Sequence, residues 1–567
     1  HSMIIGTSSM GLYHYDGQIF TEWKTEASDE LKQNKINNGI IQANHLIFGT
    51  IVKGIYVFDL DGHLLHHLHS GNGLQNNTVL AIQNDEKNNI WVGLDKGFDF
   101  VWFHSPVETY RDANMEMGSV YTAAQFQNEL YLGSNQGIYY YEIDGNDKFI
   151  NRRFLENSQG QVWFLKVIDN KLYCGLNDGT YVINKHQLSK VSDINGGYNL
   201  KQVQLGEKRK LLQSTYNEIV IYENEKDIWQ KNHVLDGFVA PARYLELDYL
   251  GNIFLGHAVT GMYLVQASTN FDSVIQYKKI GSEEGISFKT NRVFKLDNRI
   301  VTPSGTEIYQ WDALKNKFIP FDELNKQLGS FAQSKTIVAI GADKYWFIKA
   351  NEMGLFEMHF GKATLLYRLI PEMFDLELVE NYENIVELND QQHLICLQDG
   401  FAILDLAKLK QLEEITEAPM INEIVFWKTK DDQKIAVRGN EILKQQFTSG
   451  FNNFLVSFSA KENVGRRNYF QFYLEGIESN WSDWQTTTKV EFTRLPPGNY
   501  TFRLRGLTAH GMYTPETVIT LHIAPPWYLT WLAYVGYLVL FFVFFLLLYV
   551  NFKRRQWRKQ ERFLKEE

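Results

Sequence analysis

The sequence predicts an almost all-β protein: β-propeller blades, then an immunoglobulin- or fibronectin-like β-sandwich, then a single transmembrane helix. Three observations predict it. An apolar strand, a Gly turn and an aromatic-rich strand recur at intervals of about 40 to 50 residues, the length of a propeller blade. A later stretch alternates apolar and polar residues between Pro-Gly turns, as sandwich strands do. A 22-residue stretch without any charge follows it.

Composition limits the classes of protein that fit. The 567 residues correspond to about four domains of roughly 150 residues each. Aromatic residues make up 14% of the chain, which together with 41 Gly favours strands and turns over helices. The net charge is −10, and the segment after Phe552 alone carries +4, so the rest of the chain carries −14 and a broad surface for nucleic acid is excluded. Cys174 and Cys396 lie in separate apolar runs and are predicted to pack in cores; a disulfide between them is the alternative.

The repeats can be aligned on one position. LIFGTIVKGIYVFDLDG from Leu46 and LYLGSNQGIYYYEIDG from Leu130 are two of ten copies. The equivalent positions, 39 to 48 residues apart, are Gly6, Gly49, Gly93, Gly133, Gly175, Ser214, Gly256, Thr302, Lys349 and Leu397.

Ten copies exceed the 4 to 8 blades of a typical propeller. We therefore predict one complete seven-bladed ring over residues 113–412, built from the copies near Leu130 to His393. Residues 1–112 are predicted to be the last blades of an earlier ring whose beginning is missing. The alternative is a sandwich array or a solenoid.

The third copy shows the strands of one blade. Val79–Ile82, Ile90–Gly93 and Phe98–Phe103 read as three strands, and Glu108–Tyr110 as a fourth, outer strand of the same blade. Gly97, in the turn between the second and third strands, suits a positive φ. The aromatic residues are expected to pack between neighbouring blades.

Residues 525–552 are predicted to cross a membrane. Leu529–Val550 is long enough to span a hydrocarbon core of roughly 30 Å. Trp527 and Trp531 supply aromatic anchors at one end, and Lys553, Arg554 and Arg555 supply positive charge at the other. The positive-inside rule then places residues 553–567 in the cytoplasm and the rest outside it, in the periplasm of a Gram-negative cell, with the helix in the inner membrane. A buried core helix is the alternative.

Two stretches resemble known families. NGLQNNTVLAIQNDEKNNIWVGLDKGFDF from Asn72 resembles the two-component-regulator propeller repeat, through Trp91, Gly93 and Gly97. Phe454 to Tyr513, within a domain over 413–524, resembles the triple-tyrosine (Y_Y_Y) domain. Its motif residues are Leu474, Glu475, Gly476, Trp481, Trp484, Pro497, Gly498, Tyr500 and Phe502. Only Tyr500 of the three name-giving tyrosines is kept; Phe472 and Phe492 occupy the other two places.

The resemblance implies a transmembrane sensor of Bacteroidetes type, lacking its cytoplasmic output domain. Such sensors carry a histidine kinase or a LuxR-type helix-turn-helix domain after the span. The implied function is to sense an extracytoplasmic ligand, a glycan fragment, and to signal through a homodimer, without enzymatic activity or a cofactor in this chain. Alternatives are a membrane-tethered propeller glycan hydrolase or lyase, and an adhesion or assembly scaffold. The residues that bind ligand are left unassigned.

Other clusters are interpreted as structural. His63, His66, His67 and His69 fit a solvated outer strand better than a metal site. Asp59-Leu60-Asp61-Gly62 and Asp144-Gly145-Asn146-Asp147 begin like calcium loops but lack the Glu at position twelve, so hairpin turns are expected. No catalytic motif is found, so no catalytic or metal-ligating residue is assigned.

Overall fold

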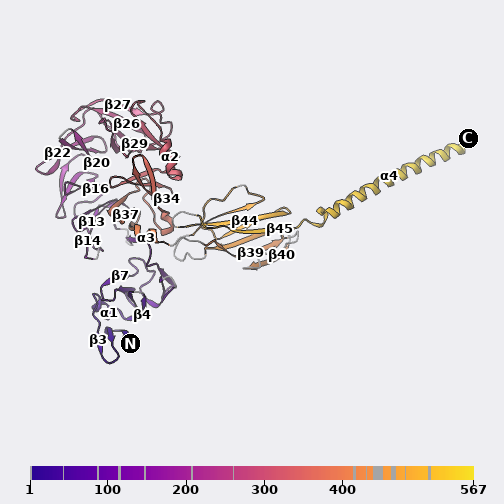
Figure 1. Ribbon diagram of the computed structural model, residues 1–567, viewed down its shortest axis with the longest axis horizontal. Helices are drawn as coiled ribbons and strands as arrows, with labels where there is room; N and C mark the ends of the chain where they lie inside the picture. Colours follow the sequence, from indigo (N-terminus) through magenta and orange to yellow (C-terminus); the bar gives the residue numbers. More distant parts are fainter. Residues whose placement is uncertain are drawn as a thin grey trace. The chain divides into compact units, whose positions relative to one another are not determined.

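A computed structural model describes the fold (Figure 1). It describes residues 3–42, 44–85, 88–112, 116–145, 148–205, 208–259, 261–350, 352–412, 417–428, 431–438, 451–460, 468–478, 480–508 and 513–566. The chain divides into two compact units near residue 413, and each is described by itself.

The first unit begins with three antiparallel sheets. One consists of β1 (Met3–Thr7), β2 (Gly11–Tyr15) and β3 (Phe20–Glu22), followed by α1 (Ser28–Asn34). The next consists of β4 (Ile36–Gln42), β5 (His45–Thr50), β6 (Ile55–Phe58) and β7 (Leu64–Leu68). The third consists of β8 (Val79–Asn84), β9 (Ile90–Leu94) and β10 (Phe98–Val101). These are the strands expected of the first three repeats.

Seven four-stranded sheets make up the rest of the first unit, as far as it is described. The first three are β12 (Val120–Phe126), β13 (Glu129–Ser134), β14 (Ile138–Ile143) and β15 (Phe149–Phe154); β16 (Val162–Ile168), β17 (Lys171–Leu176), β18 (Gly179–Asn184) and β19 (Gln187–Ser192); and β20 (Asn199–Leu205), β21 (Lys208–Ser214), β22 (Ile219–Glu225) and β23 (Ile228–Val234).

The next three sheets follow the same order. They are β24 (Ala242–Leu247), β25 (Ile253–His257), β26 (Met262–Ala267) and β27 (Val274–Ile280); β28 (Phe294–Leu296), β29 (Arg299–Pro303), β30 (Ile308–Asp312) and β31 (Lys317–Pro320); and β32 (Thr336–Ile340), β33 (Lys344–Lys349), β34 (Glu352–His359) and β35 (Lys362–Leu369). Short helices α2 (Asp322–Leu328), η1 (Gly329–Gln333) and η2 (Pro371–Phe374) lie in the connections.

The seventh sheet closes the ring with a strand from far earlier in the sequence. It contains β36 (Ile385–Asn389), β37 (Gln392–Leu397) and β38 (Gly400–Asp405), with β11 (Val107–Arg111) outside β38; α3 (Leu406–Gln411) follows. β12 lies beside both β16 and β36, so the first and last sheets are neighbours. The predicted seven-bladed ring is confirmed.

One strand assignment was wrong. The outer strand predicted at Glu108–Tyr110 exists as β11, but it does not belong to the sheet of β8 to β10. It pairs with β38, Val107 opposite Leu404. Repeat spacing alone cannot reveal this, because a closing strand has the same local pattern wherever it pairs. The domain boundaries stay predictions.

Two glycines show why the repeats keep this residue. Gly97 has φ +84, in the turn where the sequence requires a positive φ. Gly133, one of the aligned positions, lies against the next sheet: a Cβ there would be 2.6 Å from Val162 Cγ1. The glycine therefore allows neighbouring blades to approach closely.

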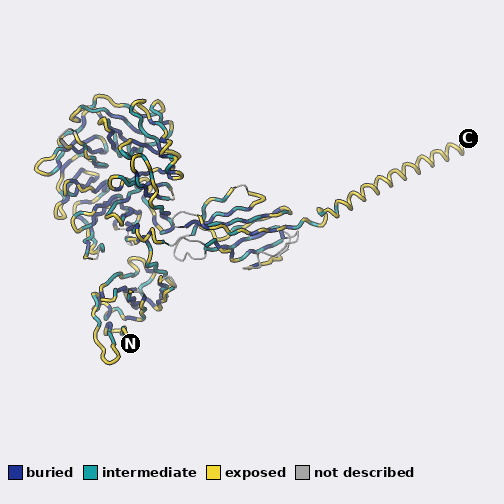
Figure 2. The backbone as a smooth tube through the Cα atoms, viewed as in Figure 1, coloured by how far each residue is buried: buried dark blue, intermediate teal, exposed yellow. Residues whose placement is uncertain are grey.

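Apolar cores lie between neighbouring sheets. Figure 2 shows the buried segments of the backbone in dark blue. Aromatic side chains contribute as expected: the Phe149 and Phe401 rings, from the first and last sheets of the ring, are 5.9 Å apart. Cys174 and Cys396 are free and buried in such cores, where burial raises the pKa of both thiols. The core-packing prediction is confirmed over the disulfide.

The second unit contains the sandwich. One sheet has the order β40 (Asp431–Arg438), β39 (Met420–Lys428), β41 (Asn453–Ser459) and β43 (Lys489–Phe492), and the other β42 (Tyr469–Glu475), β44 (Gly498–Leu507) and β45 (Thr517–Ile523). β44 alternates buried and half-buried residues along most of its length, and both sheets contribute to one core. This arrangement is the predicted sandwich.

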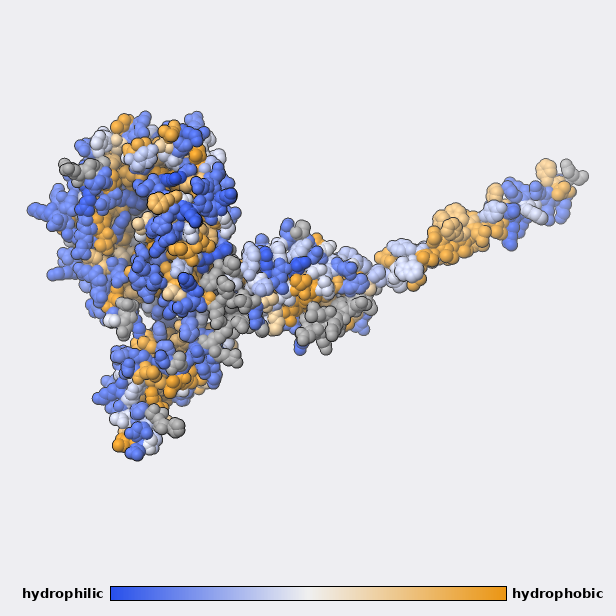
Figure 3. Space-filling model, viewed as in Figure 1, coloured by the Kyte–Doolittle hydropathy of each residue, from blue (hydrophilic) through white to orange (hydrophobic). Residues whose placement is uncertain are grey.

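A short turn, η4 (Trp527–Leu529), leads into the long helix α4 (Trp531–Glu566). In the described chain this one helix is long and apolar enough to cross a membrane, with a mean hydropathy of 2.5 over its most apolar window and none of that window buried. Figure 3 shows hydrophobic side chains along its middle and hydrophilic ones toward its C-terminal end. The alternative interpretation, a buried core helix, is therefore excluded.

Candidate ligand-binding channel

The first strands of six of the seven sheets, together with the loop before β36, surround a cavity of about 1050 Å³. Side chains of β12, β16, β20, β24, β28 and β32 and of the loop before β36 line it. A cavity of this volume is large enough for a ligand of several rings. It is therefore the candidate functional site.

β-Bulges set the direction of three of the side chains that line the cavity. The pairing of β12 with β13 shifts between Val120 and Thr122, which makes Tyr121 the extra residue. The same shift makes Trp163 the extra residue of β16 and Arg243 that of β24. A bulge redirects a side chain without ending the sheet. The repeated bulge thus places large side chains of different blades at the same level of the channel.

An aromatic cluster gathers there. The Trp163 ring centroid is 6.2 Å from Tyr121, 4.7 Å from Tyr198 and 5.8 Å from Tyr382, and the Tyr198 and Tyr216 rings are 5.1 Å apart. Trp163 Nε1 donates to Tyr216 Oη at 3.2 Å, which fixes the indole plane. All five residues are half-buried, and all of them except Tyr216 line the cavity, where a ligand can reach them.

The loop before β36 brings Tyr382 across the blades. The Arg243 guanidinium lies 3.6 Å from the Tyr382 ring centroid and donates to the Asn381 carbonyl at 2.5 Å. Arg292 donates to Asn381 Oδ1 at 2.8 Å, and Thr336 Oγ1 donates to Glu383 Oε2 at 2.9 Å. These contacts with the fourth, fifth and sixth sheets hold the loop in place.

A row of charged side chains lines the channel on adjacent strands. Lys201 of β20 is paired with Glu246 of β24 at 2.8 Å. Lys166 of β16 donates to the Leu200 carbonyl at 3.1 Å. The side chain is exposed to the channel, yet the surrounding protein desolvates the ammonium and Lys201 repels it, and together they lower the pKa of Lys166 to about 8. Lys201 therefore has a carboxylate partner, whereas the hydrogen bond of Lys166 goes to a backbone carbonyl.

Chemically, the channel combines flat aromatic faces with many hydrogen-bond donors and fixed charges. Aromatic faces bind the C–H face of rings, and donors on rigid strands select polar substituents. The arrangement suits a polar, ring-containing ligand.

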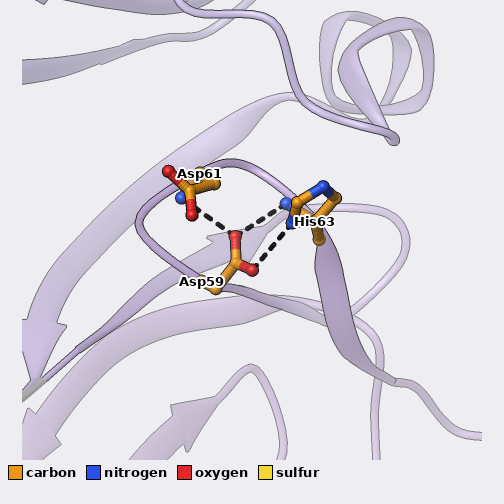
Figure 4. Close-up of side chains that lie close together, drawn as sticks. All are labelled: Asp59, Asp61 and His63. Carbon is orange, nitrogen blue, oxygen red and sulfur yellow. Dashed lines mark hydrogen bonds and ion pairs between the residues drawn. The ribbon is translucent and has the colours of Figure 1, made fainter. Parts of the chain in front are cut away.

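The acidic and histidine clusters lie outside this cavity. In Figure 4, Asp59 Oδ1 accepts hydrogen bonds from the Asp61 and His63 backbone N–H groups, both at 2.9 Å, and Asp59 Oδ2 contacts His63 Nδ1 at 2.8 Å. These bonds are those of the expected hairpin turn. Asp343, Glu357 and His359 form a similar group, in which the two carboxylate residues are half-buried and His359 is exposed.

The other candidate metal residues are placed as follows. His66 and His67 lie on β7, the outer strand of its sheet, as predicted, and His67 stacks on Tyr56 at 4.0 Å. Asp144 Oδ1 accepts from the Lys148 N–H at 2.9 Å in a turn; Asn146 and Asp147 lie outside the described residues.

The family-motif residues hold the sandwich together where the structure describes them. Tyr500 Oη donates to the Pro496 carbonyl at 2.6 Å, which fastens the turn before β44. The Phe472 and Phe492 rings lie 6.4 Å apart, in the core with buried Leu474 and Phe502.

Trp481 and Trp484 have a common neighbour. The Arg505 guanidinium is 4.1 Å from the Trp481 ring, 5.9 Å from the Trp484 ring and 4.1 Å from the Tyr513 ring. Glu475 is paired with Arg503 at 3.4 Å, and Gly476 turns the chain with φ +107. Pro497 and Gly498 lead into β44.

The remaining motif and anchor residues lie in the two outer parts of the chain. Trp91 and Gly93 lie on β9, and the Trp91 ring is 5.1 Å from Phe100. At the other end, Trp527 and Trp531 begin η4 and α4, and both are exposed. Lys553, Arg554 and Arg555 lie on α4.

Sequence reasoning left the channel residues unassigned. The position within the repeat could have identified three of them, because Tyr121, Trp163 and Arg243 each follow the apolar residue that begins the first strand of a repeat. Tyr382 gave no such signal, because its loop is specific to one blade.

Comparisons with known proteins agree with this architecture. The family model for the Y_Y_Y domain matches residues 461–524, and the model for the two component regulator propeller matches residues 73–96. The chain carries both. Comparison with curated proteins gives no match.

A solved structure is similar in fold over most of this chain. The extracellular domain of BT3049 from B. thetaiotaomicron, described as a hybrid two component system, matches with a TM-score of 0.66 and 17% identity over 92% of this chain and 71% of that one. The extracellular domain of BT4673 from the same organism matches 93% of this chain and 74% of that one at 15% identity, with a TM-score of 0.39.

Proposed function

We propose that this chain is the ectodomain and membrane anchor of a transmembrane signalling receptor that binds a glycan fragment in the channel of the seven-bladed ring. The signal passes to a cytoplasmic kinase or DNA-binding domain through dimerisation. The receptor lies in the inner membrane with its propeller blades in the periplasm. The two family matches and the shared fold with the BT3049 extracellular domain support this proposal.

The observation that carries it is the aromatic cluster around Trp163 in the channel, in a chain that also has a membrane-spanning helix. Stacked rings and hydrogen-bond donors in one rigid cavity are what recognition of a sugar requires. A ligand that binds one arrangement of the receptor more tightly shifts the population toward it.

The test is a ligand screen on the full chain in detergent or nanodiscs. Thermal unfolding and mass photometry are recorded with a broad panel of neutral and acidic oligosaccharides, and the reaction mixtures are analysed for cleavage products. We expect at least one oligosaccharide to raise the midpoint and the dimer fraction without being cleaved. Cleavage would establish the hydrolase or lyase alternative instead. A panel without any binder would contradict the proposal.

A further inference from the structure

The charges in the channel are unevenly paired. Its acidic groups have partners: Glu246 with Lys201 at 2.8 Å, and Glu383 with Thr336 at 2.9 Å. Asp248 Oδ1 accepts from the Asn252 backbone N–H at 2.9 Å in a tight turn. These contacts hold the carboxylates in place, although a neutral hydrogen-bond donor does not neutralise a carboxylate.

Three basic side chains of the lining lack a carboxylate partner of this kind. Within the described ranges, no carboxylate lies within ion-pair distance of Lys166, Arg243 or Lys295, all three of which line the channel. Asp297, also in the lining, is the one acid there for which the described residues show no side-chain hydrogen bond or ion pair. Four basic and four acidic side chains line the channel, but in the described residues only Lys201 of these four cations has an ion-pair partner.

The lining is therefore balanced in formal charge but uneven in pairing. Lys201 has Glu246 at 2.8 Å, whereas the neighbouring Lys166 ammonium donates to the Leu200 backbone carbonyl and, in the described residues, has no carboxylate within ion-pair distance. A partly desolvated ammonium without a paired anion is costly, so an anionic group of a ligand placed against Lys166 would be stabilised.

We propose that the channel binds an oligosaccharide with an anionic substituent, a carboxylate or a sulfate, placed against Lys166 while a neighbouring sugar ring stacks on the Trp163 cluster. The inference rests on the proposed function and specifies its ligand. Lys166 and Trp163 both lie on β16, three positions apart, which is about 10 Å along a strand. One pyranose ring does not span that length, so the ligand has at least two rings.

The experiment compares three probes on the full chain in nanodiscs by isothermal titration calorimetry. They are trigalacturonate, its methyl ester, which has the same rings without charge, and a sulfated galactotrisaccharide. We expect an anionic probe to bind at least tenfold more tightly than the methyl ester, with an affinity that falls between 50 and 500 mM salt, as screening requires. Which anionic probe binds identifies the substituent.

Variants locate the charge. Lys166→Met keeps the aliphatic stem and removes the ammonium, so the tenfold preference should disappear. Lys317→Met, at an exposed position of the outer strand β31, is the matched control and should keep it. Glu246→Gln should strengthen anion binding several-fold, because it frees Lys201; a damaged channel would only weaken it.

The outcomes separate this inference from the proposed function. Equal binding of the methyl ester and the anionic probes, or a preference that survives Lys166→Met, would overturn the inference while leaving a glycan receptor intact. Binding of none of the three probes, alongside a neutral binder in the broader panel, would also overturn it alone. Failure of the whole panel would overturn both.

Discussion

The N-terminal sheets and the seven-bladed ring both contain first strands with a β-bulge, but different side chains occupy the bulges. The first strands β4 and β8 have the same bulge as β12, β16 and β24, yet the extra residues are Asn37 and Leu80 in place of Tyr121, Trp163 and Arg243. The difference teaches that blade geometry is generic in this chain. Recognition depends on what occupies the bulge.

The largest effect expected concerns ring closure. Tyr110 of β11 stacks on Phe401 of β38 at 4.7 Å, so Tyr110→Ala should destabilise the ring by about 3 kcal/mol. The control in the N-terminal sheets is Phe98→Ala, at a 65% exposed position, with less than about 1 kcal/mol expected. Urea unfolding of the full chain measures both. Equal losses would mean that β11 does not close the ring.

The stability of the seven-bladed ring and that of the N-terminal sheets should depend on pH in opposite directions. Buried His393 accepts from Trp346 Nε1 at 3.0 Å, and desolvation, with a smaller contribution from Lys344, lowers the pKa of His393 to about 4. Its neutral form is therefore stabilising above pH 6.5, and that stability is lost as the pH falls toward 4. By pH 5 the loss should reach about 2 kcal/mol. His393→Gln keeps an acceptor for Trp346 and should remove this pH dependence.

His63 in the N-terminal sheets should respond with the opposite sign. The hydrogen bond that the His63 imidazole donates to the Asp59 carboxylate raises the pKa of His63, so its contribution is present below pH 6.5 and is lost as the pH rises through the folded-state value. Unfolding midpoints of His63→Gln and His393→Gln between pH 4.5 and 8 check both signs. A wild-type acid loss that persists in His393→Gln would contradict the assignment.

Ligand affinity should depend on the side chain at the bulge of β16 in the ring and not on the side chain at the bulge of β8 in the N-terminal sheets. Trp163→Ala removes the central ring of the aromatic cluster and should weaken oligosaccharide binding at least tenfold, or about 1.4 kcal/mol. Leu80→Ala changes the equivalent position of β8, and its affinity should equal that of the unmodified chain. Calorimetric titration compares them. Weaker binding by Leu80→Ala would move the site toward the N-terminal sheets.

The smallest effect expected lies in the sandwich, as a reference for both regions. Tyr500→Phe removes the 2.6 Å hydrogen bond to the Pro496 carbonyl and should cost about 1 kcal/mol of unfolding free energy, without changing ligand affinity. Thermal unfolding and titration of the same preparation check it. A change in affinity would show that this hydroxyl does more than hold the turn.

The parts that local pattern determines were predictable. The aligned positions from Gly49 to Leu397 fall at the end of the second strand of each sheet, and Gly6 falls near the end of β1, the first strand of its sheet. Leu529–Val550 lies within η4 and α4 except for the turn at Thr530. Strand pairing across nearly 300 residues was not predictable, because β11 resembles any outer strand. The channel was also beyond reach, since it forms only when Trp163, Arg243 and Tyr382 from three blades meet.

The most direct measurement is a structure of the full chain in nanodiscs with the tightest oligosaccharide from the panel. The account predicts ligand density inside the seven-bladed ring, with one sugar ring on Trp163 and an anionic substituent at Lys166. Density elsewhere on the chain, with the channel holding only solvent, would contradict it.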